Sequence, residues 1–265
     1  MPLIHLIILA LIQGLTEFLP ISSSGHLILI PNLLKWPDQG IIIDVAVHAG
    51  SLIAVLIYLW KDIGTMFIEL KSFRKPSENL NHPMIFLIFI ASVPVMISGL
   101  IISLTLDDLS RNIELIGWAT LVFGILLGVS DRYGMTLSGI KHMKYGDAIV
   151  IGFGQTLALI PGASRAGVCI TAARFLGFER SAAARFSLLL AIPAILGAST
   201  LKGTEILISK DITLGQEFLI AMGISFCAAL ASISIMMAWL NKAGFTPFVI
   251  YRILLGSGLL LWCYL

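Results

Sequence analysis

Charged residues are scarce in this chain. Asp, Glu, Lys and Arg make up 12% of its 265 residues, whereas hydrophobic residues make up 58%. A typical soluble domain carries about 25% charged residues. With a mean hydropathy of +0.98, the composition excludes an ordinary soluble domain and predicts an all-α protein that crosses a membrane several times. A net charge of +2 gives no reason to expect nucleic acid as a partner.

The chain also lacks long polar segments and has few cysteines. No polar stretch is long enough to form a soluble domain, so we expect residues 1–265 to form a single membrane domain. The N-terminus carries no basic segment followed by an A-x-A site, so no cleaved signal peptide is expected. The cysteines are widely spaced in apolar segments without a metal-ligand pattern, which favours packing as small hydrophobic side chains. They are Cys169, Cys227 and Cys263.

Two apolar segments are interrupted by polar residues in a similar order. Residues 10–30 read ALIQGLTEFLPISSSGHLILI, and residues 152–171 read GFGQTLALIPGASRAGVCIT. Each contains Gln, then Pro, then Ser, and His26 of the first break corresponds to Arg165 of the second. The apolar arms beside each break are too short for a spanning helix, which needs about 20 apolar residues. We therefore predict two re-entrant helical hairpins, whose non-helical tips protein or water must surround.

Six further apolar segments are long enough to cross the membrane. They divide the chain into two halves, each a hairpin followed by three spans, which gives pseudo-repeats 1–131 and 145–265. Because three is an odd number, the second half must be inverted relative to the first, and the hairpin tips should meet near the membrane midplane. The predicted arms are 3–19 with 25–35 and 148–160 with 165–178, and the predicted spans are 41–60, 84–104, 113–130, 182–200, 217–240 and 248–265.

The distribution of Lys and Arg predicts the orientation. If the polar, basic loop 61–83 lies in the cytoplasm, twelve basic residues lie on that side, Arg252 among them, while four lie outside and Arg165 lies within the membrane. The excess of positive charge on the cytoplasmic side then places both termini outside. The four outer residues are Lys35, Arg111, Lys202 and Lys210.

The second break contains a candidate phosphate site. A guanidinium stays charged, so Arg165 must be paired, hydrated or bound to an anion within a membrane. Arg165 begins an apolar helical arm after a turn that contains Gly162 and Ser164. Free backbone amides and the positive end of the helix dipole face the same turn, which favours an anion there. The first break offers the same geometry with Ser22, Ser23, Ser24 and Gly25.

The first break adds groups suited to catalysis. Glu17 lies four residues after Gln13, so both side chains project from one face of the first arm. This pair could hold a hard divalent cation, Mg²⁺ or Ca²⁺, with phosphate oxygens completing its shell. His26 could act as base, acid or nucleophile, and the whole set suits phosphoryl transfer. Two other interpretations stay open: Glu17 and Arg165 could form a structural ion pair, and His26 could be a helix-cap residue.

The two breaks resemble the paired motifs of the undecaprenyl-diphosphatase family, the bacitracin-resistance type of integral membrane phosphatase. The first motif is Glu or Gln, three residues, Glu, then Pro, a Ser-rich turn, Gly and His, and the chain matches it from Gln13 to His26. The second is Pro-Gly-x-Ser-Arg-Ser-Gly-x-Thr, which the chain matches from Pro161, with Ala166 and Cys169 in place of the last Ser and the Thr. Gln13 also stands where Glu is frequent.

The resemblance covers nearly the whole chain, including Tyr251-Arg252 near its end. It implies a divalent-metal-dependent hydrolase that removes the terminal phosphate of a polyprenyl lipid, undecaprenyl diphosphate, and leaves the monophosphate carrier of cell-wall synthesis. It also implies a multi-pass protein of the bacterial cytoplasmic membrane, among membrane lipids, with an active site that opens to the outer face. The residues that the resemblance carries over as essential are Glu17, Ser23, His26 and Arg165.

Several alternatives stay open at this point. A transporter or flippase for a polyprenyl phosphate or another anionic substrate would use the same plan of inverted repeats and broken helices. The convergence of Glu, Ser, His and Arg favours chemistry, because a carrier needs no nucleophile. The preferred mechanism has Ser23 as nucleophile and His26 as its base, with attack by His26 or by water as the alternatives. Small residues such as Ala228-Ala229 could form a helix interface, so a homodimer is a further open question.

Overall fold

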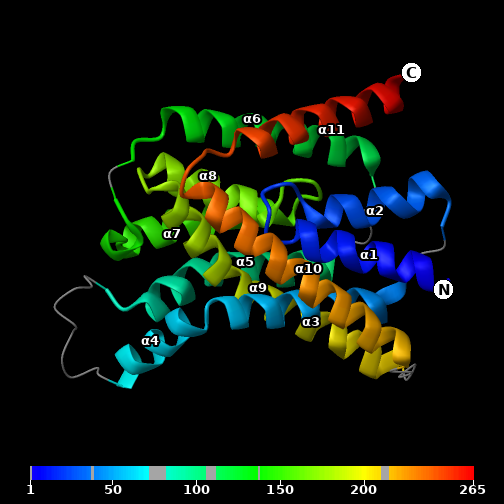
Figure 1. Ribbon diagram of the computed structural model, residues 1–265, viewed down its shortest axis with the longest axis horizontal. Helices are drawn as coiled ribbons and strands as arrows, with labels where there is room; N and C mark the ends of the chain where they lie inside the picture. The colour runs from blue at the N-terminus through cyan, green and yellow to red at the C-terminus, as the bar shows by residue number, and fades with distance from the viewer. Residues whose placement is uncertain (1, 37–38, 72–81, 106–111, 137, 210–214) are drawn as a thin grey trace.

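The computed structural model describes the chain except residues 1, 37–38, 72–81, 106–111, 137 and 210–214. Parts of the predicted loop 61–83, and Arg111 and Lys210 of the charge count, lie outside the described residues. Within the described part the regular elements are helices, as predicted, apart from an isolated bridge between Ser138 and Phe178. The helices form one elongated bundle, and both chain ends lie at the same end of its long axis (Figure 1).

The elements have the following bounds: α1 Leu3–Thr16, α2 Ser23–Leu34, α3 Gly40–Tyr58, α4 Trp60–Lys71, α5 Met84–Thr105, α6 Ile113–Tyr133, η2 Ile140–His142, α7 Tyr145–Thr156, η3 Leu157–Leu159, α8 Arg165–Phe175, α9 Arg180–Ser209, α10 Gln216–Leu240 and α11 Thr246–Tyr264.

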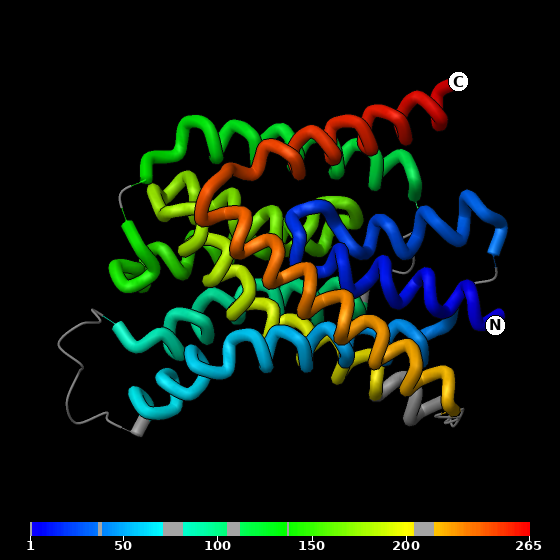
Figure 2. Tube along the Cα trace, in the orientation of Figure 1, coloured from blue at the N-terminus to red at the C-terminus, as the bar shows by residue number. Residues whose placement is uncertain are grey.

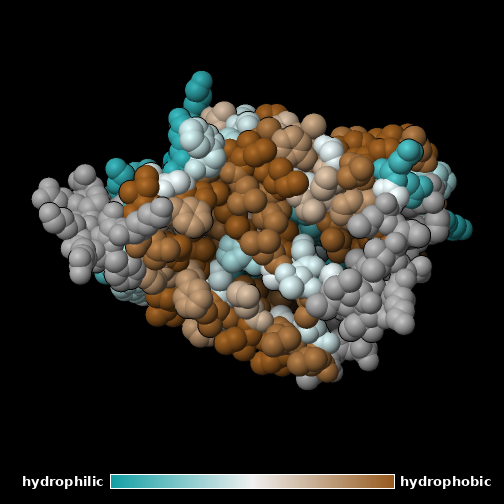
Figure 3. Space-filling model, turned by 90° about the horizontal axis from the view of Figure 1, so that it is seen from below, coloured by the Kyte–Doolittle hydropathy of each residue, from teal (hydrophilic) through white to brown (hydrophobic). Residues whose placement is uncertain are grey.

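Six helices, α3, α5, α6, α9, α10 and α11, are long and apolar enough to cross a membrane. Each corresponds to one of the six predicted spans, which are therefore confirmed by length and composition. Large apolar side chains such as Phe89 and Leu104 are exposed on them. Figure 3 shows one face that is mostly hydrophobic, with less hydrophobic residues gathered near its centre. Extensive exposure of apolar side chains is typical of a surface that contacts lipid rather than water.

The predicted hairpin arms form four shorter helices, α1, α2, α7 and α8. They contain 14, 12, 12 and 11 residues, which corresponds to lengths of about 16 to 21 Å. The hydrocarbon core of a bilayer is about 30 Å thick. None of these four helices can therefore cross it alone, in agreement with the short arms that the sequence predicts.

Part of the predicted loop 61–83 is helical instead. Its first residues belong to α4, which exposes Trp60, Phe67 and Ile68. Asp62 lies in the first turn of α4, where a negative charge favours the helix, and it pairs with Arg185 of α9 through both carboxylate oxygens, at 3.0 and 2.8 Å. The charged residues of this segment favour a loop. The exposed apolar face of α4, however, is typical of a helix that lies at a membrane surface.

Small residues allow α10 to pack closely against α1 and α3. A Cβ atom on Gly50 of α3 would lie 2.2 Å from the carbonyl oxygen of Met222, and one on Gly14 of α1 would lie 2.5 Å from that of Ser225. The hydroxyl of Ser225 also donates to the carbonyl of Val47 at 2.7 Å. Close backbone contact through small residues is the usual packing between membrane helices. It fixes α1, the helix that carries the first break.

A buried carboxylate fixes the helix that carries the second break. Asp131 at the end of α6 binds Arg180 of α9 at 2.6 Å and lies 3.6 Å from Arg174 of α8. Its other oxygen accepts a hydrogen bond from the backbone amide of Phe245 at 3.0 Å. Arg174 is almost fully buried, so a partner of opposite charge is needed to offset its desolvation. One end of α8 is thereby held in place, and Arg165 begins the other end.

The close approach of α3 to α10 gives a prediction about stability. Gly50→Ala should lower the midpoint of thermal unfolding in detergent, because overpacking of this kind costs about 1–3 kcal/mol. Gly223→Ala, on α10, is the matched control, since a Cβ there meets nothing within 4 Å and Ala favours helix by about 1 kcal/mol over Gly. Equal midpoints for the two variants would show that α3 and α10 do not meet at Gly50.

Candidate functional site

The two breaks meet at Arg252 of α11. Its guanidinium is fully buried and donates to the carbonyl of Pro20 in the first break at 3.1 Å and to that of Gly162 in the second at 3.0 Å. It also donates to the α6 carbonyls of Thr120 and Ala119, at 3.2 and 3.5 Å. One side chain thus satisfies carbonyls left without helical partners where the chain breaks. Figure 2 shows the two hairpins approaching each other from opposite ends of the bundle, with their turns near its middle.

The two breaks have the same local conformation. Ser22 and Ser164 have φ values of 77° and 70°, a conformation that costs a residue other than glycine about 1–3 kcal/mol. Each serine caps the following helix by accepting a hydrogen bond from an amide three residues on, Gly25 at 3.3 Å and Gly167 at 3.2 Å. A Cβ at Gly167 would lie 2.9 Å from Nη1 of Arg252. These two predicted phosphate-binding serines therefore shape the turns.

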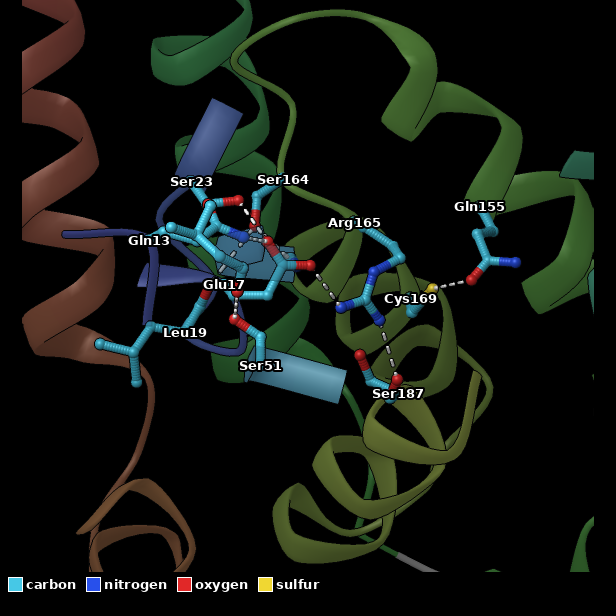
Figure 4. Close-up of polar contacts among 12 residues, drawn as sticks. Gln13, Glu17, Leu19, Ser23, Ser51, Gln155, Ser164, Arg165, Cys169 and Ser187 are labelled. Carbon is cyan, nitrogen blue, oxygen red and sulfur yellow. Dashed lines mark hydrogen bonds and ion pairs between the residues drawn. The ribbon is translucent and has the colours of Figure 1, made fainter. Parts of the chain in front are cut away.

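Glu17 lies at the centre of a polar cluster drawn from both breaks (Figure 4). Its Oε2 accepts hydrogen bonds from the hydroxyl of Ser23 at 2.6 Å and from the amide of Gln13 at 2.8 Å. Its Oε1 accepts from Nη2 of Arg165 at 3.2 Å, across the two breaks. The Glu17 side chain is only 8% exposed. The structure therefore brings together three of the four predicted catalytic residues.

Arg165 is held from several sides. Its Nη1 donates to the carbonyl of Ser187 at 3.2 Å, and the guanidinium lies 6.0 Å from the ring centroid of Phe18. The ion pair with Glu17, one of the interpretations left open by the sequence, is present. It does not exclude anion binding, because a guanidinium has five N–H donors and these contacts use two of them.

His26 lies in the first turn of α2 with different partners. Its Nδ1 is 2.6 Å from the carbonyl oxygen of Ser22, and its Nε2 is 2.5 Å from the hydroxyl of Tyr251. Both ring nitrogens are thus engaged, and the hydroxyl of Ser23 donates to Glu17. The structure therefore gives Glu17, rather than His26, as the hydrogen-bond partner of Ser23.

Gln13 and Glu17 are the predicted metal ligands, and their contacts test the fit. The Oε1 of Gln13 is buried without a hydrogen-bond partner, which leaves one hard oxygen beside the carboxylate. The Oε1 of Glu17 accepts only from Arg165 and retains a further lone pair, whereas Oε2 already accepts two hydrogen bonds. Among the described residues no three or more His, Cys, Asp and Glu side chains gather where they could hold a metal ion. The pair fits Mg²⁺ or Ca²⁺ only if phosphate and water supply most of the ligands.

The role of Arg252 was missed by reasoning from the residues alone. The charge distribution predicts a cytoplasmic position for Arg252, but the side chain is buried beside the breaks. The available signal was a charged residue inside the predicted span 248–265, since such residues are rare and face the protein interior. Removing Arg252 from the count leaves eleven cytoplasmic residues against four, so the predicted orientation is unchanged.

Comparison with known proteins extends over the whole chain. Residues 6–258 match the family described as "Bacitracin resistance protein BacA". A protein named "Undecaprenyl-diphosphatase" from Roseobacter denitrificans is 44% identical over 266 residues, which cover 100% of both chains. "Undecaprenyl-diphosphatase 1" from Rhodospirillum rubrum is 46% identical over 276 residues, 100% of this chain and 96% of the relative. A third, "Undecaprenyl-diphosphatase" from Jannaschia sp., is 45% identical over 270 residues and all of both chains.

Proposed function

Because the chain belongs to the bacitracin resistance protein BacA family, we propose that it is an undecaprenyl-diphosphatase. It hydrolyses undecaprenyl diphosphate to undecaprenyl phosphate and inorganic phosphate, and so returns the lipid carrier to peptidoglycan synthesis. The observation that carries the proposal is the meeting of Glu17, Ser23 and Arg165 at hydrogen-bond distances between two breaks. A nucleophile, its base and an anion-binding group are the parts that transfer of a phosphoryl group requires.

Arg165 binds the terminal phosphate in this proposal. Its planar fork matches two phosphate oxygens, and its side chain keeps 14% of its surface exposed. Arg165 is also the first residue of α8, so the N–H groups of that helix and the positive end of its dipole favour an anion at the same point. The further phosphate contacts that we assign come from the turn residues Ser22, Ser24, Gly25, Gly162 and Ser164.

Ser23 is the nucleophile that this geometry supports best. Its hydroxyl proton passes to Glu17, to which it is already hydrogen-bonded, while Oγ forms a bond to the terminal phosphorus. The bond from phosphorus to the bridging oxygen breaks, and undecaprenyl phosphate leaves with the electron pair. In the second step the oxygen of water forms a bond to phosphorus, the bond from phosphorus to Oγ of Ser23 breaks, and Glu17 returns its proton to Oγ, so that inorganic phosphate is released. His26 lies three residues after Ser23, on the same side of α2. Its Nε2 is bonded to the hydroxyl of Tyr251, so the proton of the water passes to the phenol oxygen while the phenol proton moves to Nε2.

A divalent cation could bind beside the reacting groups without changing the role of any of these residues. Glu17 and Gln13 are the residues that would hold it, and the unpartnered Oε1 of Gln13 supports this assignment. Mg²⁺ or Ca²⁺ would supply positive charge that offsets the charge of the diphosphate. Gln13 contributes a neutral oxygen where the family motif often has a carboxylate, so the metal affinity of this chain should be modest.

We also propose that residues 1–131 and 145–265 form inverted repeats with re-entrant hairpins. The starts of α1 and α7 are separated by the same number of residues as the starts of α2 and α8. The strained caps Ser22 and Ser164 recur at this same spacing. This spacing pairs Arg165 with Ser23 rather than with His26, the counterpart that the order of polar residues predicts. α1 packs against α10 of the other half and α7 packs against α5, while α6 packs against α11. This exchange of equivalent partners is what two inverted halves would produce.

The assignment of Arg165 predicts that a lysine cannot replace it. Arg165→Lys keeps the charge but loses the fork, so phosphate release from undecaprenyl diphosphate should fall on the order of 10²-fold or more. Arg185→Lys is the control, because its pair with Asp62 is half exposed and such pairs contribute little. Near wild-type turnover by Arg165→Lys would reject the phosphate-binding role.

The metal assignment predicts that a chelator abolishes phosphate release and that Mg²⁺ restores it. Gln13→Glu adds an anionic oxygen, so it should lower the Mg²⁺ concentration needed for half-maximal release by about tenfold. Glu17→Gln should remove activity at every Mg²⁺ concentration. If the wild type releases phosphate at an unchanged rate in the presence of chelator, the metal role is wrong, while the Ser23 and Glu17 chemistry stands.

The proposed orientation predicts which positions react from each side of the membrane. Lys35 and Lys141 are both exposed, and they lie on opposite sides if both termini are outside. In a chain whose native cysteines are replaced by alanine, an impermeant thiol reagent should label Lys35→Cys from outside intact cells. Lys141→Cys should react only after the membrane is opened. Labelling of both positions from outside would reject the inverted repeat and the outward-facing site.

A further inference from the structure

His26 is held at both ring nitrogens, and one of its partners is a tyrosine from the other half of the chain. The hydroxyl of Tyr251 lies 2.5 Å from Nε2, and the carbonyl oxygen of Ser22 lies 2.6 Å from Nδ1. The rings of His26 and Tyr251 are nearly parallel, at 13°, with centroids 5.7 Å apart. The imidazole is therefore fixed in plane and in direction by two elements far apart in the sequence.

The two contacts determine which nitrogen carries the hydrogen. A carbonyl oxygen can only accept, so the hydrogen of the neutral ring lies on Nδ1, directed at Ser22. Nε2 then presents a lone pair and accepts from the hydroxyl of Tyr251. When Nε2 gains a proton, the N–H group donates a hydrogen bond to the same hydroxyl oxygen, because a phenol is both a donor and an acceptor. One partner thus serves both protonation states of His26.

The position of Tyr251 is set by its helix rather than by its own burial. Tyr251 leaves 41% of its surface exposed, so packing alone holds it weakly. The next residue, Arg252, is bound to both breaks. One turn further on, a Cβ at Gly256 would lie 2.8 Å from the backbone nitrogen of Leu121, so α11 packs tightly along α6. Helix α11 thereby holds the phenol beside His26, and it cannot shift without moving the two breaks.

We propose that Tyr251 positions His26 and relays protons to it. It holds the imidazole with Nδ1 protonated, and protons of the reaction reach Nε2 through the phenol hydroxyl that is bonded there. The inference rests on the proposed role of His26 as the group that accepts a proton from water. Loss of the phenol hydroxyl should free the ring to adopt the other tautomer and to rotate, with no loss of a group that contacts phosphate.

The first test reads the tautomer directly. In protein labelled with ¹⁵N-histidine, the wild-type His26 should show a protonated Nδ1 and a bare Nε2, and His26→Gln identifies its signals. Tyr251→Phe should give a mixture that includes protonated Nε2. Tyr264→Phe, on the same helix, is the control, because its hydroxyl contacts Glu114 and Trp118 instead. A wild-type ring protonated at Nε2 would overturn the inference without any activity measurement.

The second test separates positioning from binding. General acid–base catalysis contributes about 10²–10⁴-fold, so a misaligned His26 should cost Tyr251→Phe about tenfold in kcat, with KM within about twofold and Tyr264→Phe unchanged. An unchanged kcat, or a loss confined to KM, would overturn the inference. If the wild type releases no phosphate, the proposed function fails instead, while the tautomer is still decided by the spectrum. The wild-type spectrum also keeps the inference testable if Tyr251→Phe does not fold.

Discussion

A single buried guanidinium joins the two halves of this protein. Arg252 lies on α11, yet it binds the carbonyl of Pro20 in one break and that of Gly162 in the other. A charge inside a membrane protein is costly, and Arg252 is fully buried. The arrangement is stable because carbonyls released by two helix breaks need donors, and one planar group with five N–H bonds supplies them. The free carbonyls at the breaks thus accept the hydrogen bonds that the buried guanidinium must donate.

The reactive groups follow from this junction. With the breaks joined, Glu17 of the first break accepts from Arg165 of the second at 3.2 Å and from Ser23 beside it at 2.6 Å. The strained caps Ser22 and Ser164 persist because the junction and the packed helices enforce them. The site is therefore assembled from residues distant in sequence, and its geometry depends on contacts that do not touch the phosphate.

Much of this arrangement could be predicted because polar residues are conspicuous in an apolar chain. The six spans follow from length and hydropathy, and the cluster of Glu17 with Arg165 follows from two interrupted segments. The partner of Ser23 could not be predicted, since Glu17 and His26 are both near it in sequence and only the fold selects Glu17. A charge inside a predicted span indicates that Arg252 faces the protein interior, but not which carbonyls it binds, because these partners lie far away in the chain. Helix α4 was missed because its charges resemble those of a loop.

The most direct test of the junction is the rate of phosphate release by Arg252→Lys, purified in the folded state and assayed with undecaprenyl diphosphate. A lysine keeps the positive charge but cannot reach carbonyls of both breaks with a fixed fork. Since Arg252 contacts no phosphate in the proposed mechanism, any loss must come from misalignment of the breaks. We expect a fall on the order of 10²-fold, as for a displacement of catalytic groups by about 1 Å. A folded Arg252→Lys protein with the wild-type rate would contradict this expectation.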